Sequence, residues 1–128
     1  MQVYRQGDVC IIKLPESAKV DVSKEALPVD PDKGVVLAFG EVTGHAHSLD
    51  AAVCALYDGE PLDGQSVEEM LAQLGGGLVP QATDRVLDVR RSTFLAHDEH
   101  DPIQLEEGVY VVRRQREYDP EAEHLVED

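Results

Sequence analysis

Four of the five histidines in this sequence occur as two closely spaced pairs. The first pair is His45-Ala46-His47 and the second is His97-Asp98-Glu99-His100, while His124 lies near the C-terminus. Neutral imidazole is the commonest protein ligand for transition metals near pH 7. Side chains two positions apart on a β-strand point to the same side, so the first pair can chelate one ion.

The second pair lies where a predicted strand gives way to a polar turn. If the chain turns after His97, then His100 folds back beside it, and the two pairs converge when their strands are neighbours in a sheet. The sequence therefore predicts a divalent transition metal ion held by His45, His47, His97 and His100. Such ligands suit Zn, Fe, Mn, Ni or Cu, and the sequence does not select among these metals.

The chemistry that such a site would perform stays open at this point. If the site is catalytic, an open coordination position would activate water or dioxygen or polarise a small substrate, and Glu99 is the candidate acid–base residue. Two other interpretations stand beside this one. The histidines form a hydrogen-bonded structural cluster in a non-catalytic interaction or assembly module, or they are unconnected surface residues.

Most of the elements that must position these residues are predicted to be strands. Short runs rich in β-branched and other apolar residues, bounded by Gly, Pro and Asp, are typical of strands. They cover residues 9–12, 35–39, 45–49, 51–57, 86–89, 92–97, 103–105 and 109–118. One short helix is predicted near residues 66–74, because Ser66 and Glu69 form a capping box before an apolar face and three glycines follow.

These elements predict a mainly β protein, an antiparallel β-sandwich or barrel with one short helix. A single domain is expected over residues 1–118, with residues 15–34 as a long surface loop that holds three prolines. Residues 119–128 are expected to form an acidic C-terminal tail.

A resemblance to a known family rests on Gly40, Gly44, His45 and His47. This G-x-x-x-G-H-x-H pattern resembles the first metal motif of the cupin superfamily, which implies a small β-barrel with a metal site and a further histidine ligand, His97 or His100, from a later strand. The glutamate of that motif has no counterpart in the sequence that follows His47. The segments YRQGDV, GEVTGHAH and HDEHDPI also resemble uncharacterised bacterial proteins of similar layout.

The composition argues against two classes of partner. Acidic residues number 26 against 11 basic ones, which gives a formal charge of −15. Nucleic acids and anionic membranes are bound through Lys and Arg, so neither is an expected partner. A small-molecule ligand and a homo-oligomer stay open.

The cysteines and arginines are predicted to have structural roles. Cys10 and Cys54 lie in apolar stretches and are expected to be buried, reduced thiols of a cytoplasmic protein. The arginines near residues 90 and 114 are expected to form ion pairs, with Asp8, Glu41 and Asp88 as candidate partners. Binding of a small anion by these arginines is the alternative.

Overall fold

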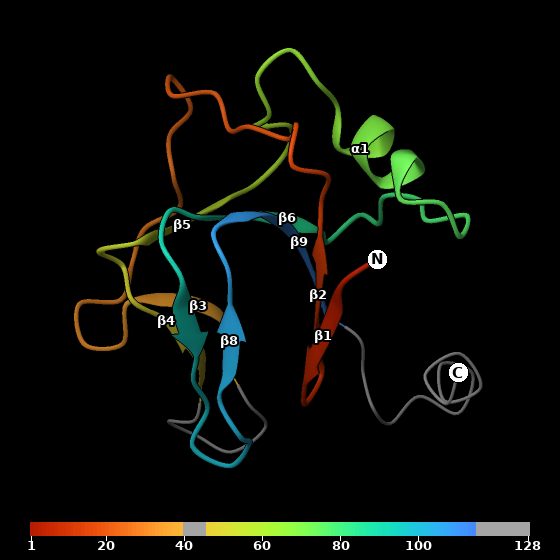
Figure 1. Ribbon diagram of the computed structural model, residues 1–128. Coiled ribbons are helices and arrows are strands. Elements are labelled where there is room, and N and C mark those ends of the chain that lie inside the picture. Colours follow the sequence, from red (N-terminus) through yellow and green to blue (C-terminus); the bar gives the residue numbers. More distant parts are fainter. Residues whose placement is uncertain (40–45, 115–128) are drawn as a thin grey trace.

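The computed structural model describes residues 1–39 and 46–114, which contain nine strands and one helix (Figure 1). The predictions for His45, for residues 115–118 and for the tail at 119–128 lie outside the described residues. The strands are β1 (Val3–Gln6), β2 (Val9–Lys13), β3 (Val35–Phe39), β4 (Ala46–Leu49), β5 (Cys54–Tyr57), β6 (Arg85–Val89), β7 (Thr93–Leu95), β8 (Ile103–Leu105) and β9 (Gly108–Arg114). The helix is α1 (Val67–Gln73).

The largest sheet has five strands in the order β1-β2-β9-β6-β5, and each neighbouring pair is antiparallel. Two smaller antiparallel pairs, β3-β4 and β7-β8, lie apart from it. The prediction of a mainly β, antiparallel fold with one short helix is confirmed, and the described strands do not close into a barrel. The hairpin strand β1 was not among the predicted strands.

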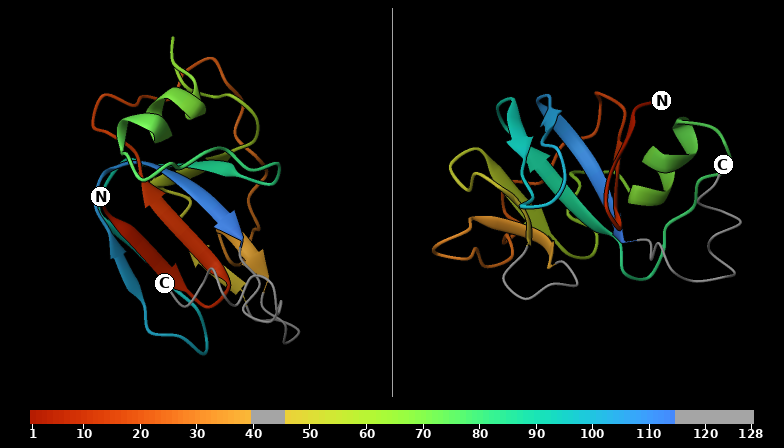
Figure 2. Two further views of the ribbon diagram at one scale, coloured as in Figure 1. Left: turned by 90° about the vertical axis from the view of Figure 1, so that its right-hand side faces the viewer. Right: turned by 90° about the horizontal axis from the view of Figure 1, so that it is seen from below.

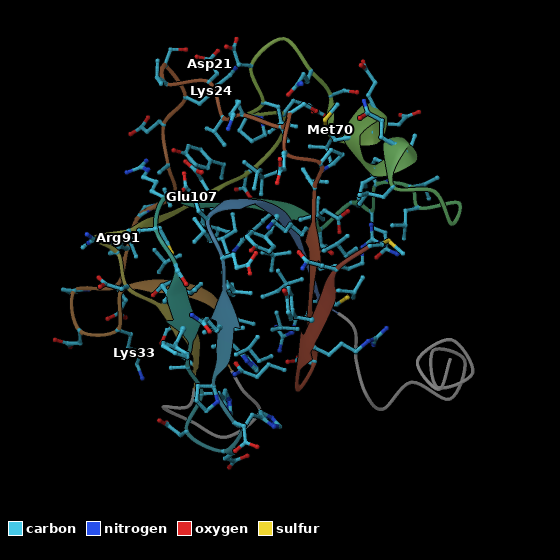
Figure 3. The ribbon with its side chains drawn as sticks, in the orientation of Figure 1. Asp21, Lys24, Lys33, Met70, Arg91 and Glu107 are labelled. Carbon is cyan, nitrogen blue, oxygen red and sulfur yellow. The ribbon has the colours of Figure 1, made fainter. Side chains whose placement is uncertain are left out.

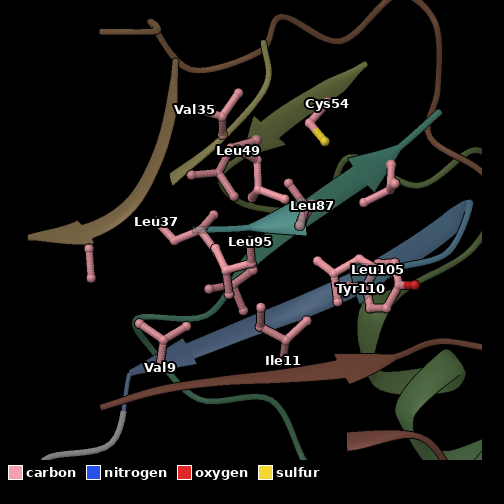
Figure 4. Close-up of a cluster of buried hydrophobic side chains, with 14 of the residues drawn as sticks. Val9, Ile11, Val35, Leu37, Leu49, Cys54, Leu87, Leu95, Leu105 and Tyr110 are labelled. Atoms are coloured by element: carbon pink, nitrogen blue, oxygen red, sulfur yellow. The ribbon is translucent and has the colours of Figure 1, made fainter. Parts of the chain in front are cut away.

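Both faces of the five-stranded sheet are covered, which explains why its strands are apolar at consecutive positions rather than at alternate ones. One face carries Val9, Ile11, Leu87 and Tyr110, which pack against residues from the two strand pairs (Figure 4). The opposite face packs against α1 and the segment that follows β2. Figure 2 shows the helix and the small strand pairs on different sides of the sheet.

The helix forms as its capping signals predict. Ser66 is the N-cap, and its side chain accepts a hydrogen bond of 3.0 Å from the backbone N–H of Glu69. Met70, labelled in Figure 3, is buried between α1 and the sheet. These contacts hold the helix on the face of the sheet away from the two strand pairs.

The segment at residues 15–34 contains no helix or strand, as predicted. Its backbone is nevertheless tied to the segment between β5 and α1, because the N–H of Asp21 donates to Pro61 and the N–H of Asp63 donates to Lys19. Asp21 and Lys24, labelled in Figure 3, lie at the outer part of this connection. The segment therefore covers the sheet while remaining irregular.

Candidate functional site

His47 is the most deeply buried histidine among the described residues, with 1% of its surface exposed. It lies in β4, which pairs with β3 so that His47 is opposite Ala38. The next residue, Ser48, exchanges two backbone hydrogen bonds with Ala96, of 3.0 and 2.9 Å. This bridge joins the two histidine-bearing segments and places His97 beside His47.

The rings of His47, His97 and His100 lie against one another and are called the histidine cluster below. Their centroids are 4.3 Å apart for His47 and His97, 4.6 Å for His97 and His100, and 6.0 Å for His47 and His100. Two segments about 50 residues apart in the sequence therefore meet, which is the condition under which the two histidine pairs were expected to converge. His45 and His124 lie outside the described residues.

Gln6 fixes which ring nitrogen of His47 carries the proton. The amide nitrogen of Gln6 donates to the carbonyl oxygens of Leu95 and Asp101, at 3.1 and 2.9 Å. The Gln6 amide oxygen must therefore face His47 Nδ1, which lies 2.8 Å away. Because an amide oxygen only accepts, His47 Nδ1 is the donor, and in the neutral ring Nε2 has a lone pair without a proton.

Asp8 lies next to that lone pair. Its Oδ1 is 3.4 Å from His47 Nε2, and its Oδ2 accepts a hydrogen bond of 2.7 Å from Arg114 Nε. Gly7, between Gln6 and Asp8, has a φ of +57°, and a Cβ there would come within 2.8 Å of His100 Nε2. The turn between β1 and β2 thus packs directly on the histidine cluster.

The surroundings of His47 favour its neutral form. Burial, and to a smaller extent the neighbouring His97, lower the pKa of His47 to about 4. The Asp8 carboxylate acts in the opposite direction but does not overcome the cost of placing a charged ring in the interior. At neutral pH the lone pair of Nε2 is therefore available as a ligand.

His97 is held differently, because its Nδ1 accepts a hydrogen bond of 3.0 Å from the backbone N–H of Glu99. In the neutral ring its proton then lies on Nε2, so His97 can act as a metal ligand only after this hydrogen bond or that proton is given up.

Within residues 1–39 and 46–114, no group of three or more His, Cys, Asp or Glu side chains is arranged to hold a metal ion. Glu99, the candidate acid–base residue, is exposed and lies in the same loop as His97.

The sequence interpretation missed Gln6 as a site residue and assigned Asp8 only to an ion pair. One signal in the sequence pointed to the turn beside them. Gly7 and Asp8 separate two extended runs by two residues, which is typical of a β-hairpin. The role of Gln6 is visible only in the structure, where this polar side chain is 3% exposed and needs a partner.

The predicted ion pairs are confirmed for two of the acidic residues. Asp8 pairs with Arg114, and Asp88 lies 3.5 Å from Arg90. Arg113 instead forms a buried pair with Asp84, at 2.9 Å. Cys10 and Cys54 are buried and free, as expected. Glu41 lies outside the described residues.

Comparison with known proteins gives a family without an assigned activity. The profile of a family described as "Domain of unknown function (DUF8820)" matches residues 5–115. No curated protein and no solved structure matches the chain. These comparisons do not bear on the resemblance to cupins, which stays a prediction. In the described part of the chain, no helix combines the length and the apolar character needed to cross a bilayer.

Proposed function

Since the chain belongs to the DUF8820 family, whose description states no activity, we propose from the site alone that this protein binds a divalent transition metal ion at its histidine cluster. The ion would be Zn, Fe, Mn, Ni or Cu, with ligands from His47, His97, His100 and, as the sequence predicts, His45. Whether bound metal performs catalysis, with Glu99 as the acid–base residue, is a further part of the same proposal.

One observation carries the proposal: three imidazole rings come from two segments that are distant in the sequence, and their centroids are 4.3 to 6.0 Å apart. One of them, His47, is buried and has a fixed tautomer. Metal-binding histidines commonly donate their other ring N–H to an oxygen atom, which orients the ring and makes it a better ligand. The hydrogen bond from His47 Nδ1 to Gln6 has this character.

The loop that carries His97 and His100 supplies the adjustable part of the site. Both rings lie beside His47, and neither residue is as buried as His47. Binding by His97 would replace its hydrogen bond to the backbone N–H of Glu99 with a bond to the ion. A metal–nitrogen bond compensates for one lost hydrogen bond, which is worth only about 1 kcal/mol.

The alternative function is a non-catalytic interaction or assembly module in which the histidines are structural. The hydrogen bond between Glu99 and His97 and the ring contacts among the three histidines favour it. In that case the ring contacts hold the β4 segment against the segment that follows β7, and no metal ion is needed. The two functions differ in whether the protein has measurable metal affinity.

The sandwich architecture, the cytoplasmic location and a small-molecule partner, which the sequence predicts or leaves open, belong to this proposal as well. The buried cluster between the five-stranded sheet and the two strand pairs supports a sandwich rather than a closed barrel. The free thiols of Cys10 and Cys54 support a cytoplasmic location. A small-molecule partner would reach the ion from the exposed side, where His100 lies.

Calorimetric titration with Zn²⁺ and Co²⁺ tests the proposal, on protein without a histidine tag. We expect the wild type to bind one ion per chain and His97→Ala to bind at least about tenfold more weakly. Binding should also weaken as the pH falls below about 6.5, since protons compete for the ring nitrogens.

The matched control is His124→Ala, which removes a histidine predicted to lie in the tail. Its affinity should equal that of the wild type. No binding by the wild type, or the same affinity in His97→Ala, would contradict the metal proposal and leave the structural cluster as the better explanation.

A further inference from the structure

We propose that Asp8 is a ligand of the same ion, so that the turn between β1 and β2 supplies a carboxylate to the metal site. This inference rests on the proposed function. Asp8 is absent from the predicted ligand set because the sequence gives no reason to bring residue 8 beside residue 47. The structure brings Asp8 Oδ1 to 3.4 Å from His47 Nε2.

The tautomer of His47 makes this contact unusual. Gln6 uses its amide protons on Leu95 and Asp101, so its oxygen requires the proton of His47 to be on Nδ1. In the neutral ring, Nε2 and the carboxylate oxygen then face each other as two acceptors. Two acceptors repel unless a cation or a proton lies between them.

The distance favours a metal cation over a proton. An N–H···O hydrogen bond between an imidazolium and a carboxylate has a typical length of about 2.7 to 2.9 Å, well below the 3.4 Å observed here. Two ligand atoms that each lie about 2.1 Å from one ion in tetrahedral geometry are separated by about 3.4 Å. The two atoms therefore have the spacing of neighbouring ligands of one ion.

The position of Asp8 is fixed by contacts that leave Oδ1 facing His47. Arg114 donates from Nε to the other carboxylate oxygen, Oδ2, at 2.7 Å. Gly7, with its positive φ, is the first residue of the turn after β1, and Asp8, the next residue, lies against His47. The side chain of Asp8 is 19% exposed, so it is in contact with solvent.

A carboxylate changes which metals the site prefers. Three neutral imidazoles and one carboxylate give a site with one negative charge, which suits a divalent ion of borderline hardness such as Zn²⁺ or Fe²⁺, and the carboxylate also suits the harder Mn²⁺. Cu⁺ favours sulfur ligands, and the described thiols, Cys10 and Cys54, belong to the two apolar core clusters. We therefore expect the ion to be a divalent one with both nitrogen and oxygen ligands.

The test compares Asp8→Asn with Arg114→Gln in titrations with Zn²⁺ and Co²⁺. Asp8→Asn keeps the shape of the side chain and removes its charge, whereas Arg114→Gln removes the same ion pair and keeps the carboxylate. We expect Asp8→Asn to bind Zn²⁺ at least about tenfold more weakly, and its Co²⁺ absorption bands to shift. Arg114→Gln should bind as tightly as the wild type or more tightly, because the carboxylate no longer shares its charge with Arg114.

The outcomes separate this inference from the proposed function. If the wild type binds metal and Asp8→Asn binds equally well with the same Co²⁺ spectrum, Asp8 is not a ligand although the histidine site stands. If both variants lose affinity to the same extent, the ion pair acts structurally and the inference is wrong. If the wild type binds no metal, the proposed function itself fails. Thermal unfolding of both variants confirms that each is folded before titration.

Discussion

The two nitrogens of the His47 ring face different partners, Gln6 on one side and Asp8 on the other. A buried polar group that lacks a partner is costly, so the Gln6 contact accounts for the depth at which this imidazole lies. Gln6 also bonds to the carbonyls of Leu95 and Asp101, which bracket the loop with His97 and His100. One glutamine side chain thus organises all the described histidines of the site.

The low pKa of His47 predicts that acid destabilises the protein through this residue. Its pKa is about 4 in the folded state and about 6.5 when unfolded, so below pH 6.5 the unfolded chain binds the extra proton first. Stability is therefore complete above about pH 6.5 and falls as the pH drops from about 6.5 to about 4, by on the order of 3 kcal/mol. Urea unfolding in the presence of a chelator, at several pH values in this window, measures the loss.

The control for this experiment is His47→Gln, which keeps a donor for Gln6 but does not titrate. Carboxylates also lose stability in acid, so the informative quantity is the difference between the two slopes of unfolding free energy against pH. Equal slopes in the wild type and His47→Gln would show that His47 does not have a lowered pKa.

At this scale, the histidines could be found from the sequence and their partners could not. The H-x-H spacing on an extended segment and the turn after His97 are local features, and they led to His47, His97 and His100. Gln6 and Asp8 contact residues 39 to 106 positions away. Such side-chain contacts depend on how strands are ordered in space, which one sequence does not state.

Among the elements, the β1–β2 hairpin contributes most to the site. Its two-residue turn places Gln6 and Asp8 on either side of His47, and its strands pair in register from Val3–Ile12 to Gln6–Val9. The strand β2 is then fixed by β9 on its other side. The hairpin is therefore held firmly enough to position a side chain over the cluster.

Gly7→Ala tests how closely this turn packs on the histidines. The φ of +57° costs an alanine about 1 kcal/mol, and its Cβ would crowd His100 Nε2 at 2.8 Å and His47 Cε1 at 3.2 Å. The His100 side chain can move, whereas the buried His47 ring cannot move without disturbing its hydrogen bonds. We expect the unfolding free energy to fall by about 2 kcal/mol in urea denaturation.

The matched variant is Gly59→Ala, where φ is +71° and no atom lies within 4 Å of the added Cβ. It carries the backbone cost alone, so the difference between the two variants measures the crowding of the rings. The same loss of stability in both would mean that the turn does not press on the cluster.

The strands themselves were largely predictable, but their order was not. Apolar runs between turn residues located β2 to β9, and the capping box located α1. The order β1-β2-β9-β6-β5 places the last strand between the second and the sixth. The run of four buried residues in β2 reflects its central place in this order, since both of its faces are covered.

At the scale of the whole molecule, the net charge of −15 opposes compaction. Exposed carboxylates repel one another when the chain folds, and salt screens this repulsion. Raising NaCl from about 20 mM to about 200 mM shortens the screening length from about 20 Å to about 7 Å. We expect the unfolding temperature to rise by several degrees over this range, as measured by circular dichroism with a chelator present.

Repeating the melts with choline chloride separates screening from binding of a particular cation. Both salts should raise the unfolding temperature to the same extent at equal ionic strength. A rise with NaCl alone would point to a specific sodium site, and no rise with either salt would show that charge repulsion is not a significant cost.

The bonds from Gln6 to Leu95 and Asp101 also bear on the order of events while the chain is made. A ribosome releases residue 6 long before residue 101. The edge of β2 that does not pair with β1 has no partner strand until β9 has been synthesised. Loops of this length close slowly compared with local hairpins. The hairpin of residues 3–13 can therefore make its contacts with the site only after nearly the whole chain has been synthesised. The part of the site that is encoded first is completed last.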